Sequence, residues 1–187
     1  MRFDAAELPG VIVVTPEVFP DRRGFLFETY HQEKFREGGI TATFVQDTQS
    51  RSSFGVIRGL HAQRLHPQAK LVRVLRGAIF DVAVDIRRGS PTFRRWVAVE
   101  LSADNRRMLF IPGDFAHGFC VLSSYAEVEY KTGDFYAPGD ELRIAWNDPS
   151  IGVRWPTTSP VLSEADSRAR TLDELIDLLP IHDPSRR

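Results

Sequence analysis

The chain has 187 residues, of which 42% are hydrophobic and 26% charged, and its 24 basic and 25 acidic side chains give a formal net charge of −1. This length and composition fit one globular domain over residues 1–187, exclude a largely disordered chain, and provide no overall basic field for nucleic acid. No apolar run is long enough to cross a bilayer, the start lacks the apolar core of a signal peptide, and the single cysteine excludes an intrachain disulfide. We therefore expect a cytoplasmic protein without a membrane or nucleic-acid partner.

Short apolar runs separated by turn residues make up most of the chain, a pattern typical of a sandwich or barrel. Only residues 31–39 in the first part of the chain predict a short helix, ended by Gly38 or Gly39. So many strands in so short a chain favour an all-β, double-sheet jelly roll of the cupin type. In chain order, the expected strands are 11–15 (the first), 25–30, 43–50, 70–75, 78–86, 96–101, 108–111, 115–122 and 126–132, followed by shorter pieces at 144–148 and 153–155.

Helical signals are convincing only at the C-terminal end. Thr171 and Glu174 have the spacing of a capping box, in which each residue satisfies a free N–H group at a helix start, and the apolar run 175–179 follows them. We expect residues 160–187 to form a helical tail on the β domain.

The stretch from Gly55 to Lys70 concentrates cationic and titratable side chains. A histidine such as His61 can change protonation near neutral pH. Strict alternation places Lys70, Val72 and Val74 on one strand face, so that the ammonium heads an apolar column. An unpaired buried charge is unfavourable, which points to an anionic, carbonyl-containing ligand, although an edge lysine that blunts aggregation is the alternative.

Two later strands place further polar groups on apolar faces. His117 alternates with Phe115 and Phe119, and Tyr130 alternates with Val128. A core histidine bonded to the backbone and a core tyrosine with its hydroxyl at the rim are the structural alternatives. The coincidence of histidine, lysine and tyrosine on inward faces favours a functional site.

Arg58 and His61 differ by three positions, so a regular strand would place them on opposite faces. Gly59 between them permits a β-bulge that would re-aim one of the two side chains, and a position of Arg58 at the rim of the site is the alternative. The position two after His61 is Gln63, a poor metal ligand, and His66 beside Pro67 is expected in a loop. We therefore expect no metal and no other cofactor.

Seven ordered blocks carry a more specific signal: VFPDRRGFLFETY, FVQDTQS, GVIRGLHAQ, AKLVRVLRGAIFDVAVDIRRGSPTF, IPGDFAHGF, YKTGDFYAPGDE and WNDPSIGVRWP. In order and spacing, from about Val11 to Asp166, the chain resembles the dTDP-4-dehydrorhamnose 3,5-epimerases, which are metal-free cupins. The resemblance implies an isomerase that epimerises a dTDP-4-keto-6-deoxyhexose at C3 and C5 through an enolate. The product would be dTDP-4-dehydro-L-rhamnose, in dTDP-L-rhamnose biosynthesis.

The resemblance also implies residue roles. His61 would be the base, paired with Asp166, while Tyr130 would be the acid on the opposite face and Lys70 would stabilise the enolate oxygen. It implies a homodimer as well, in which the early segment is exchanged, so that Arg23 serves the partner's site. The substrate-binding positions would be Arg23, Glu28, Gln46, Thr48, Arg58, His117, Tyr136 and Glu141.

The chain departs from the usual family pattern at Thr48, Ala62, Asp114 and Phe135, where Asn, an aromatic residue, Gly and Tyr are common. The first two flank the sugar-nucleotide region. These two departures leave the substrate details and single or double epimerisation open. The alternatives are a 3- or 5-monoepimerase or a ketoisomerase on the same scaffold, a non-catalytic sugar-nucleotide-binding cupin and, as the weakest, a metal-dependent cupin.

Overall fold

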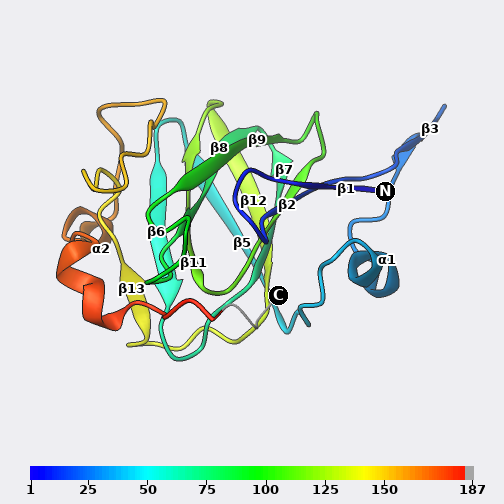
Figure 1. Cartoon of the computed structure of the whole chain (residues 1–187). Helices are drawn as coiled ribbons and strands as arrows, with labels where there is room; N and C mark the ends of the chain where they lie inside the picture. Colours follow the sequence, from blue (N-terminus) through cyan, green and yellow to red (C-terminus); the bar gives the residue numbers. More distant parts are fainter. Residues whose placement is uncertain (184–187) are drawn as a thin grey trace.

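The structure, a computed structural model, describes residues 1–183, and two antiparallel sheets that lie face to face dominate it (Figure 1). One sheet has six strands in the order β1 (Arg2–Ala5), β2 (Ile12–Thr15), β10 (Met108–Ile111), β7 (Lys70–Arg76), β12 (Tyr125–Thr132) and β5 (Gln46–Ser53). The other has five, in the order β13 (Glu141–Arg143), β6 (Ile57–Gln63), β11 (Phe115–Val121), β8 (Ala78–Asp85) and β9 (Trp96–Ser102). The predicted double-sheet, all-β fold is confirmed.

Apolar side chains from both sheets fill the space between them. Val72 and Val128 come from the six-stranded sheet, and Ala83 and Phe115 from the five-stranded sheet, and all four belong to one buried cluster. Burial of this apolar surface is the main force that holds the sheets together. Because alternate residues point inward, the predicted column of Lys70, Val72 and Val74 is buried as expected.

The helices are short. Helix α1 (Gln32–Glu37) begins after His31, whose ring accepts a hydrogen bond from a backbone N–H, and ends at Gly38, as predicted. Near the C-terminus lie α2 (Glu164–Ser167) and a 3-10 helix, η1 (Asp173–Leu178). Thr171 donates its backbone N–H and its hydroxyl to the Glu174 carboxylate, each at 2.7 Å, so the predicted capping box forms. The end of the predicted helical tail, 184–187, lies outside the described residues. Within residues 1–183, no helix is long and apolar enough to cross a membrane.

Four strand predictions are wrong in detail. Residues 11–15 do not form the first strand, because β1 precedes them. The strand predicted over 25–30 ends at Leu26; Tyr30 instead packs its ring against those of Phe35 and Phe44, with centroids 4.9 and 5.6 Å away. The pieces at 144–148 and 153–155 are not strands, and local contacts such as the 2.7 Å hydrogen bond from the Trp155 indole to the Trp146 carbonyl hold them.

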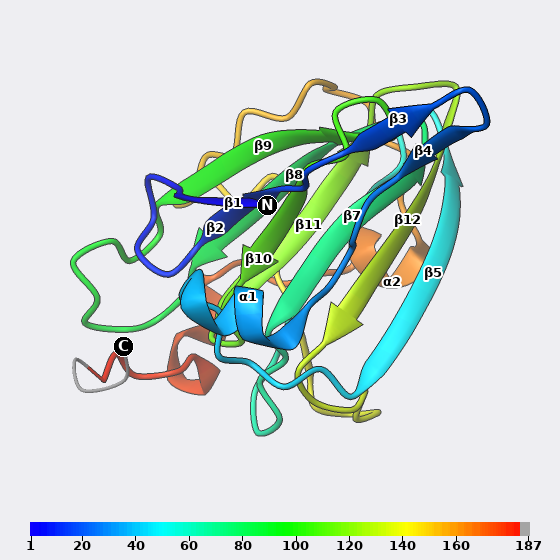
Figure 2. The ribbon, with the colours of Figure 1, turned by 90° about the vertical axis from the view of Figure 1, so that its right-hand side faces the viewer.

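A two-stranded hairpin, β3 (Phe19–Asp21) and β4 (Gly24–Leu26), projects to one side of the two sheets in Figure 1 and crosses in front of them in Figure 2. Phe25 and Leu26 on this hairpin are 59% and 72% exposed. The guanidinium of Arg106 lies 4.4 Å from the centre of the Phe25 ring.

Candidate active site

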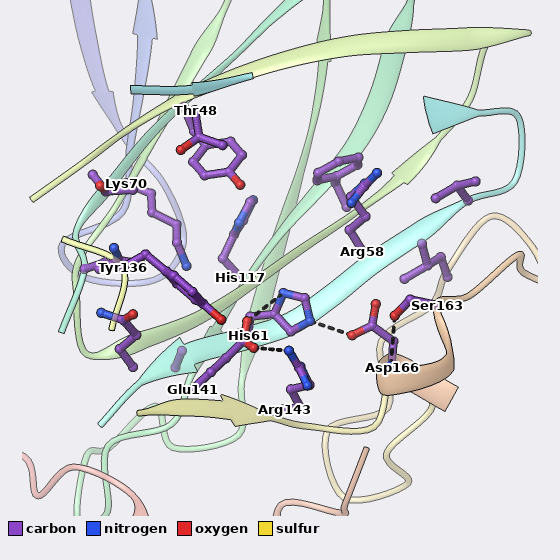
Figure 3. Close-up of a pocket in the computed structure, with 18 of the residues that line it drawn as sticks. Thr48, Arg58, His61, Lys70, His117, Tyr136, Glu141, Arg143, Ser163 and Asp166 are labelled. Carbon is purple, nitrogen blue, oxygen red and sulfur yellow. Dashed lines mark hydrogen bonds and ion pairs between the residues drawn. The ribbon is translucent and has the colours of Figure 1, made fainter. Parts of the chain in front are cut away.

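A cavity of about 670 Å³ lies between the two sheets. Strands β5, β7 and β12 line it from one side, and β6, β11 and β13 line it from the other, so side chains of opposite sheets face each other across it. The cavity collects every predicted site residue except Arg23 and Glu28: Gln46, Thr48, Arg58, His61, Lys70, His117, Tyr130, Tyr136, Glu141 and Asp166 (Figure 3).

His61 and Asp166 form a partly buried pair although 105 positions separate them in the sequence. Nε2 of His61 lies 2.6 Å from Oδ1 of Asp166, which sits on α2. The side chain of Ser163 caps α2 by accepting the Asp166 backbone N–H at 3.0 Å. Burial by itself would raise the pKa of Asp166, but the hydrogen bond and charge of His61 hold it below its ordinary value. An ionised Asp166 accepts a hydrogen bond from Nε2–H of His61, which leaves Nδ1 without a proton and able to act as a base.

A second carboxylate faces the other ring nitrogen. Oε1 of Glu141 lies 3.8 Å from Nδ1 of His61, beyond hydrogen-bond distance. The other oxygen of Glu141 pairs with the guanidinium of Arg143, and both residues belong to β13 (Figure 3). Arg143 lines the cavity but was missed at the sequence level. Its alternation with Glu141, two positions earlier, was the available signal.

Lys70 and Tyr130 approach the cavity from the six-stranded sheet. Burial lowers the pKa of Lys70 from 10.5 to about 8, against the opposite influence of the Glu141 and Asp81 carboxylates. Burial raises the pKa of Tyr130, and Glu141 adds to this while Arg58 opposes it. Tyr130 therefore keeps its proton near neutral pH, and Lys70 remains mostly charged there.

An irregularity in the backbone of β6 explains how Arg58 and His61, three positions apart, reach the same cavity. His117 of β11 is the register partner of His61, whereas Phe119 is the partner of Arg58, so two residues of β6 oppose one of β11. This is the predicted bulge, and it turns both side chains into the cavity. Gly59 in the bulge has φ +126°, and a Cβ there would lie 2.5 Å from the Cα of Gly118, so only glycine fits.

His117 also has a carboxylate partner, which the sequence reading missed. Its Nε2 lies 2.7 Å from Oδ1 of Asp81, and both side chains are buried. Asp81 lies within the apolar run of β8, and for this reason the sequence did not indicate a site residue there. His117 is thus a buried histidine whose Nε2 contacts a carboxylate instead of the backbone, and its role in substrate binding stays a prediction.

Arg23 and Glu28 are the predicted site residues that the chain does not bring to its own cavity. The Arg23 guanidinium pairs with Asp21 at 2.6 Å on the exposed hairpin. Glu28 pairs with Lys34 of α1 at the surface.

Gln63 lines the cavity, and its side-chain amide bonds to the backbone of two loops. Its amide nitrogen donates to the carbonyls of His66 and Phe135, at 2.7 and 3.1 Å, and its amide oxygen accepts the N–H of Ala137 at 2.8 Å. His66 lies in a loop, as predicted. Among residues 1–183, no group of three or more His, Cys, Asp or Glu side chains is placed to hold a metal ion.

The residues of the cavity suit proton transfer next to a carbonyl group. A neutral imidazole oriented by a carboxylate is a general base, a protonated phenol is a general acid, and a buried ammonium stabilises a negative oxygen. The fold and the site thus define a jelly-roll protein that can move protons on opposite sides of a bound carbonyl compound.

Comparisons with known proteins identify the family. The profile of the dTDP-4-dehydrorhamnose 3,5-epimerases matches residues 5–174, and the chain belongs to this family. The dTDP-4-dehydrorhamnose 3,5-epimerase of Pseudomonas aeruginosa is 53% identical over 172 residues, which are 91% of this chain and 95% of the relative. The dTDP-4-dehydrorhamnose 3-epimerase of Streptomyces niveus is 38% identical over 186 residues, 97% of this chain and 90% of the relative.

A solved structure agrees in fold over almost the whole length. The dTDP-6-deoxy-D-glucose-3,5-epimerase of Legionella pneumophila, in complex with dTDP-4-keto-L-rhamnose, superposes with a TM-score of 0.94 at 44% identity, covering 97% of this chain and 98% of that one. The cupin-type fold and the family that the sequence blocks indicated are both confirmed.

Proposed function

We propose that this protein epimerises a dTDP-4-keto-6-deoxyhexose at C3 and C5, giving dTDP-4-dehydro-L-rhamnose for dTDP-L-rhamnose biosynthesis. The observation that carries the proposal is the His61–Asp166 pair on one wall of a cavity whose other wall bears Tyr130 and Lys70. Family membership and the bound dTDP-sugar of the Legionella relative support the substrate class.

The first step is removal of a proton next to the ketone. The C4 carbonyl acidifies the hydrogens on C3 and C5, because the electron pair left by the proton moves onto the carbonyl oxygen as an enolate. Nδ1 of His61 accepts the proton, and the 2.6 Å contact with Asp166 stabilises the imidazolium that results. Lys70 places a positive charge by the enolate oxygen within a largely buried environment, where such a charge acts most strongly.

The second step returns a proton to the opposite face of the same carbon. The Tyr130 hydroxyl donates its proton as the enolate electron pair re-forms the C–H bond, and the configuration is inverted. Tyr130 and His61 come from opposite sheets, which supplies the two-sided arrangement that inversion needs. Proton exchange with solvent then restores the phenol and the neutral imidazole. Repetition at the second carbon completes the double epimerisation.

The nucleotide would extend toward the rim of the cavity. Tyr136 is 50% exposed there and offers an aromatic face for the base, while Arg58 offers a guanidinium for the diphosphate. We propose a homodimer in which the hairpin carries Arg23 and Glu28 to the partner's cavity. The exposed Phe25 and Leu26 would then be buried between the subunits. A single domain over 1–187 and a cytoplasmic location stay predictions.

Proton NMR of the reaction in deuterated water tests the function. Incubation with dTDP-4-keto-6-deoxyglucose should give an inverted product that carries deuterium at both C3 and C5. Deuterium and inversion at one centre alone would identify a monoepimerase, as in the Streptomyces niveus relative. No exchange and no inversion would refute catalysis and favour a binding protein.

A further inference from the structure

His61 lies between two carboxylates. The carboxylate at Nε2 orients the ring for its role as a base, whereas a carboxylate bound to Nδ1 would block that role. Asp166 contacts Nε2 at 2.6 Å, and Glu141 faces Nδ1 at 3.8 Å. The Asp166 and Glu141 side chains are only 5% and 18% exposed, so solvent screens them weakly. Two nearby negative charges favour the imidazolium, and an imidazolium cannot remove a proton from substrate.

Arg143 occupies the position that can correct this excess of negative charge. It is the direct register partner of His61 between β13 and β6, so both side chains project from the same face of the sheet. Its guanidinium nevertheless turns to the oxygen of Glu141 that points away from the imidazole (Figure 3). It also contributes a positive charge felt by Asp166.

We infer that Arg143 is a positioning residue: it binds Glu141, compensates the charge of that carboxylate, and holds it beyond hydrogen-bond distance of Nδ1, so that this nitrogen stays open to the substrate proton. This inference rests on the proposed function. Without Arg143, the Glu141 carboxylate is free to close the 3.8 Å gap to Nδ1 and to stabilise a protonated ring. The nitrogen that should receive the substrate proton would then be occupied.

Other charged and titratable groups face His61 from each surrounding element. They are Asp166 on α2, Glu141 and Arg143 on β13, His117 on β11, Arg58 on β6, Lys70 on β7 and Tyr130 on β12. A substitution confined to Arg143 leaves the other six groups chemically unchanged, so a change in His61 titration reports the lost guanidinium and the response of Glu141.

The variant Arg143→Gln tests the inference through NMR titration of the His61 ring in the protein without substrate. Protonation of His61 should persist to a pH about one unit higher than in the unaltered protein. With substrate, the acidic limb of the kcat/KM profile should move in the same direction, so that kcat/KM falls about tenfold on that limb and changes little on the alkaline side.

Three further variants make the result specific. Arg143→Lys should restore most of the original titration, because it restores the charge. The double variant Arg143→Gln/Glu141→Gln should return the His61 titration toward that of the unaltered protein, because it removes the carboxylate that Arg143 restrains. Arg168→Gln removes an exposed guanidinium that pairs with Glu164 on α2, and it should leave the titration unchanged.

An unchanged His61 titration in a folded Arg143→Gln variant overturns the inference, as does an equal shift in the Arg168→Gln control. A shift that the double variant fails to reverse also overturns it, since Glu141 would then not be the mediator. The NMR titration needs no substrate, so it stands or falls separately from the epimerase activity.

Discussion

The buried charge of Lys70 should lower the stability of the folded protein while it supports catalysis. The substitution Lys70→Met keeps a side chain of similar length in the buried column with Val72 and Val74 and removes the charge. The fall of the Lys70 pKa from 10.5 to about 8, caused mainly by burial, corresponds to about 3 kcal/mol of destabilisation of the charged form. The variant should therefore unfold at a higher urea concentration, and its free energy of unfolding should rise by an amount approaching about 3 kcal/mol. Its kcat should fall roughly 100- to 1000-fold.

The pH dependence gives the sign of this effect. Below about pH 8, Lys70 is charged in both the folded and the unfolded chain, and the full destabilisation is present. Between about 8 and 10.5 the folded chain loses the proton first, so the unfolded chain binds more protons and the stability of the unaltered protein rises with pH. The advantage of Lys70→Met should shrink across this window.

Urea unfolding of the two proteins across this pH range is the assay, and Lys131→Met is the control. Lys131 lies on β12, the strand that also carries Tyr130, but it does not line the cavity. Its ammonium pairs with Asp47 on β5 at 2.9 Å. Its removal should change the free energy of unfolding by less than about 1 kcal/mol, without the same pH dependence. A Lys70→Met variant that is less stable than the unaltered protein near neutral pH would refute the argument, as would full retention of turnover.

Three other predictions follow from the site and the hairpin. Asp166→Asn should lower kcat roughly 10- to 150-fold, since a charged hydrogen bond of about 1.5–3 kcal/mol is lost; equal activity in a steady-state assay would contradict its role. Gly59→Ala should reduce the free energy of unfolding by about 2 kcal/mol or more in urea titrations. The control Gly24→Ala, at φ +138° but with nothing within 4 Å of the added Cβ, should reduce the free energy of unfolding by less. Equal reductions in the two variants would argue against the clash in the bulge. Co-expression of Arg23→Ala and His61→Asn chains should restore activity in mixed dimers, because one cavity then has both intact side chains, and failure of two folded, dimerising variants to complement would argue against hairpin exchange.

The sequence predicted the inward faces well, because alternation on a strand is a local property. Strand 108–111 was predicted with the bounds of β10, and the inward positions of His117 and Tyr130 followed from their neighbours. The bulge at Gly59 was predictable because two side chains at odd spacing needed one cavity, and glycine is the residue that allows it.

What failed depended on contacts between distant segments. Phe27 to Tyr30 have strand composition, yet Tyr30 finds ring partners in α1 and in the segment before β5. The pairing of His61 with Asp166 has no local signal and came from the family resemblance. Helix α2 itself did have a local signal, because Ser163 stands three positions before Asp166 at the spacing of an N-cap. The sequence analysis overlooked this signal.

The opposed placement of His61 and Tyr130 is tested most directly by exchange without inversion in the Tyr130→Phe variant. In deuterated water, His61 should still remove protons and return deuterium to the same face, so recovered substrate should carry deuterium with its configuration unchanged and product should be almost absent. Inverted product formed at the normal rate by Tyr130→Phe, or exchange that persists when His61 is replaced by Asn, would contradict the account.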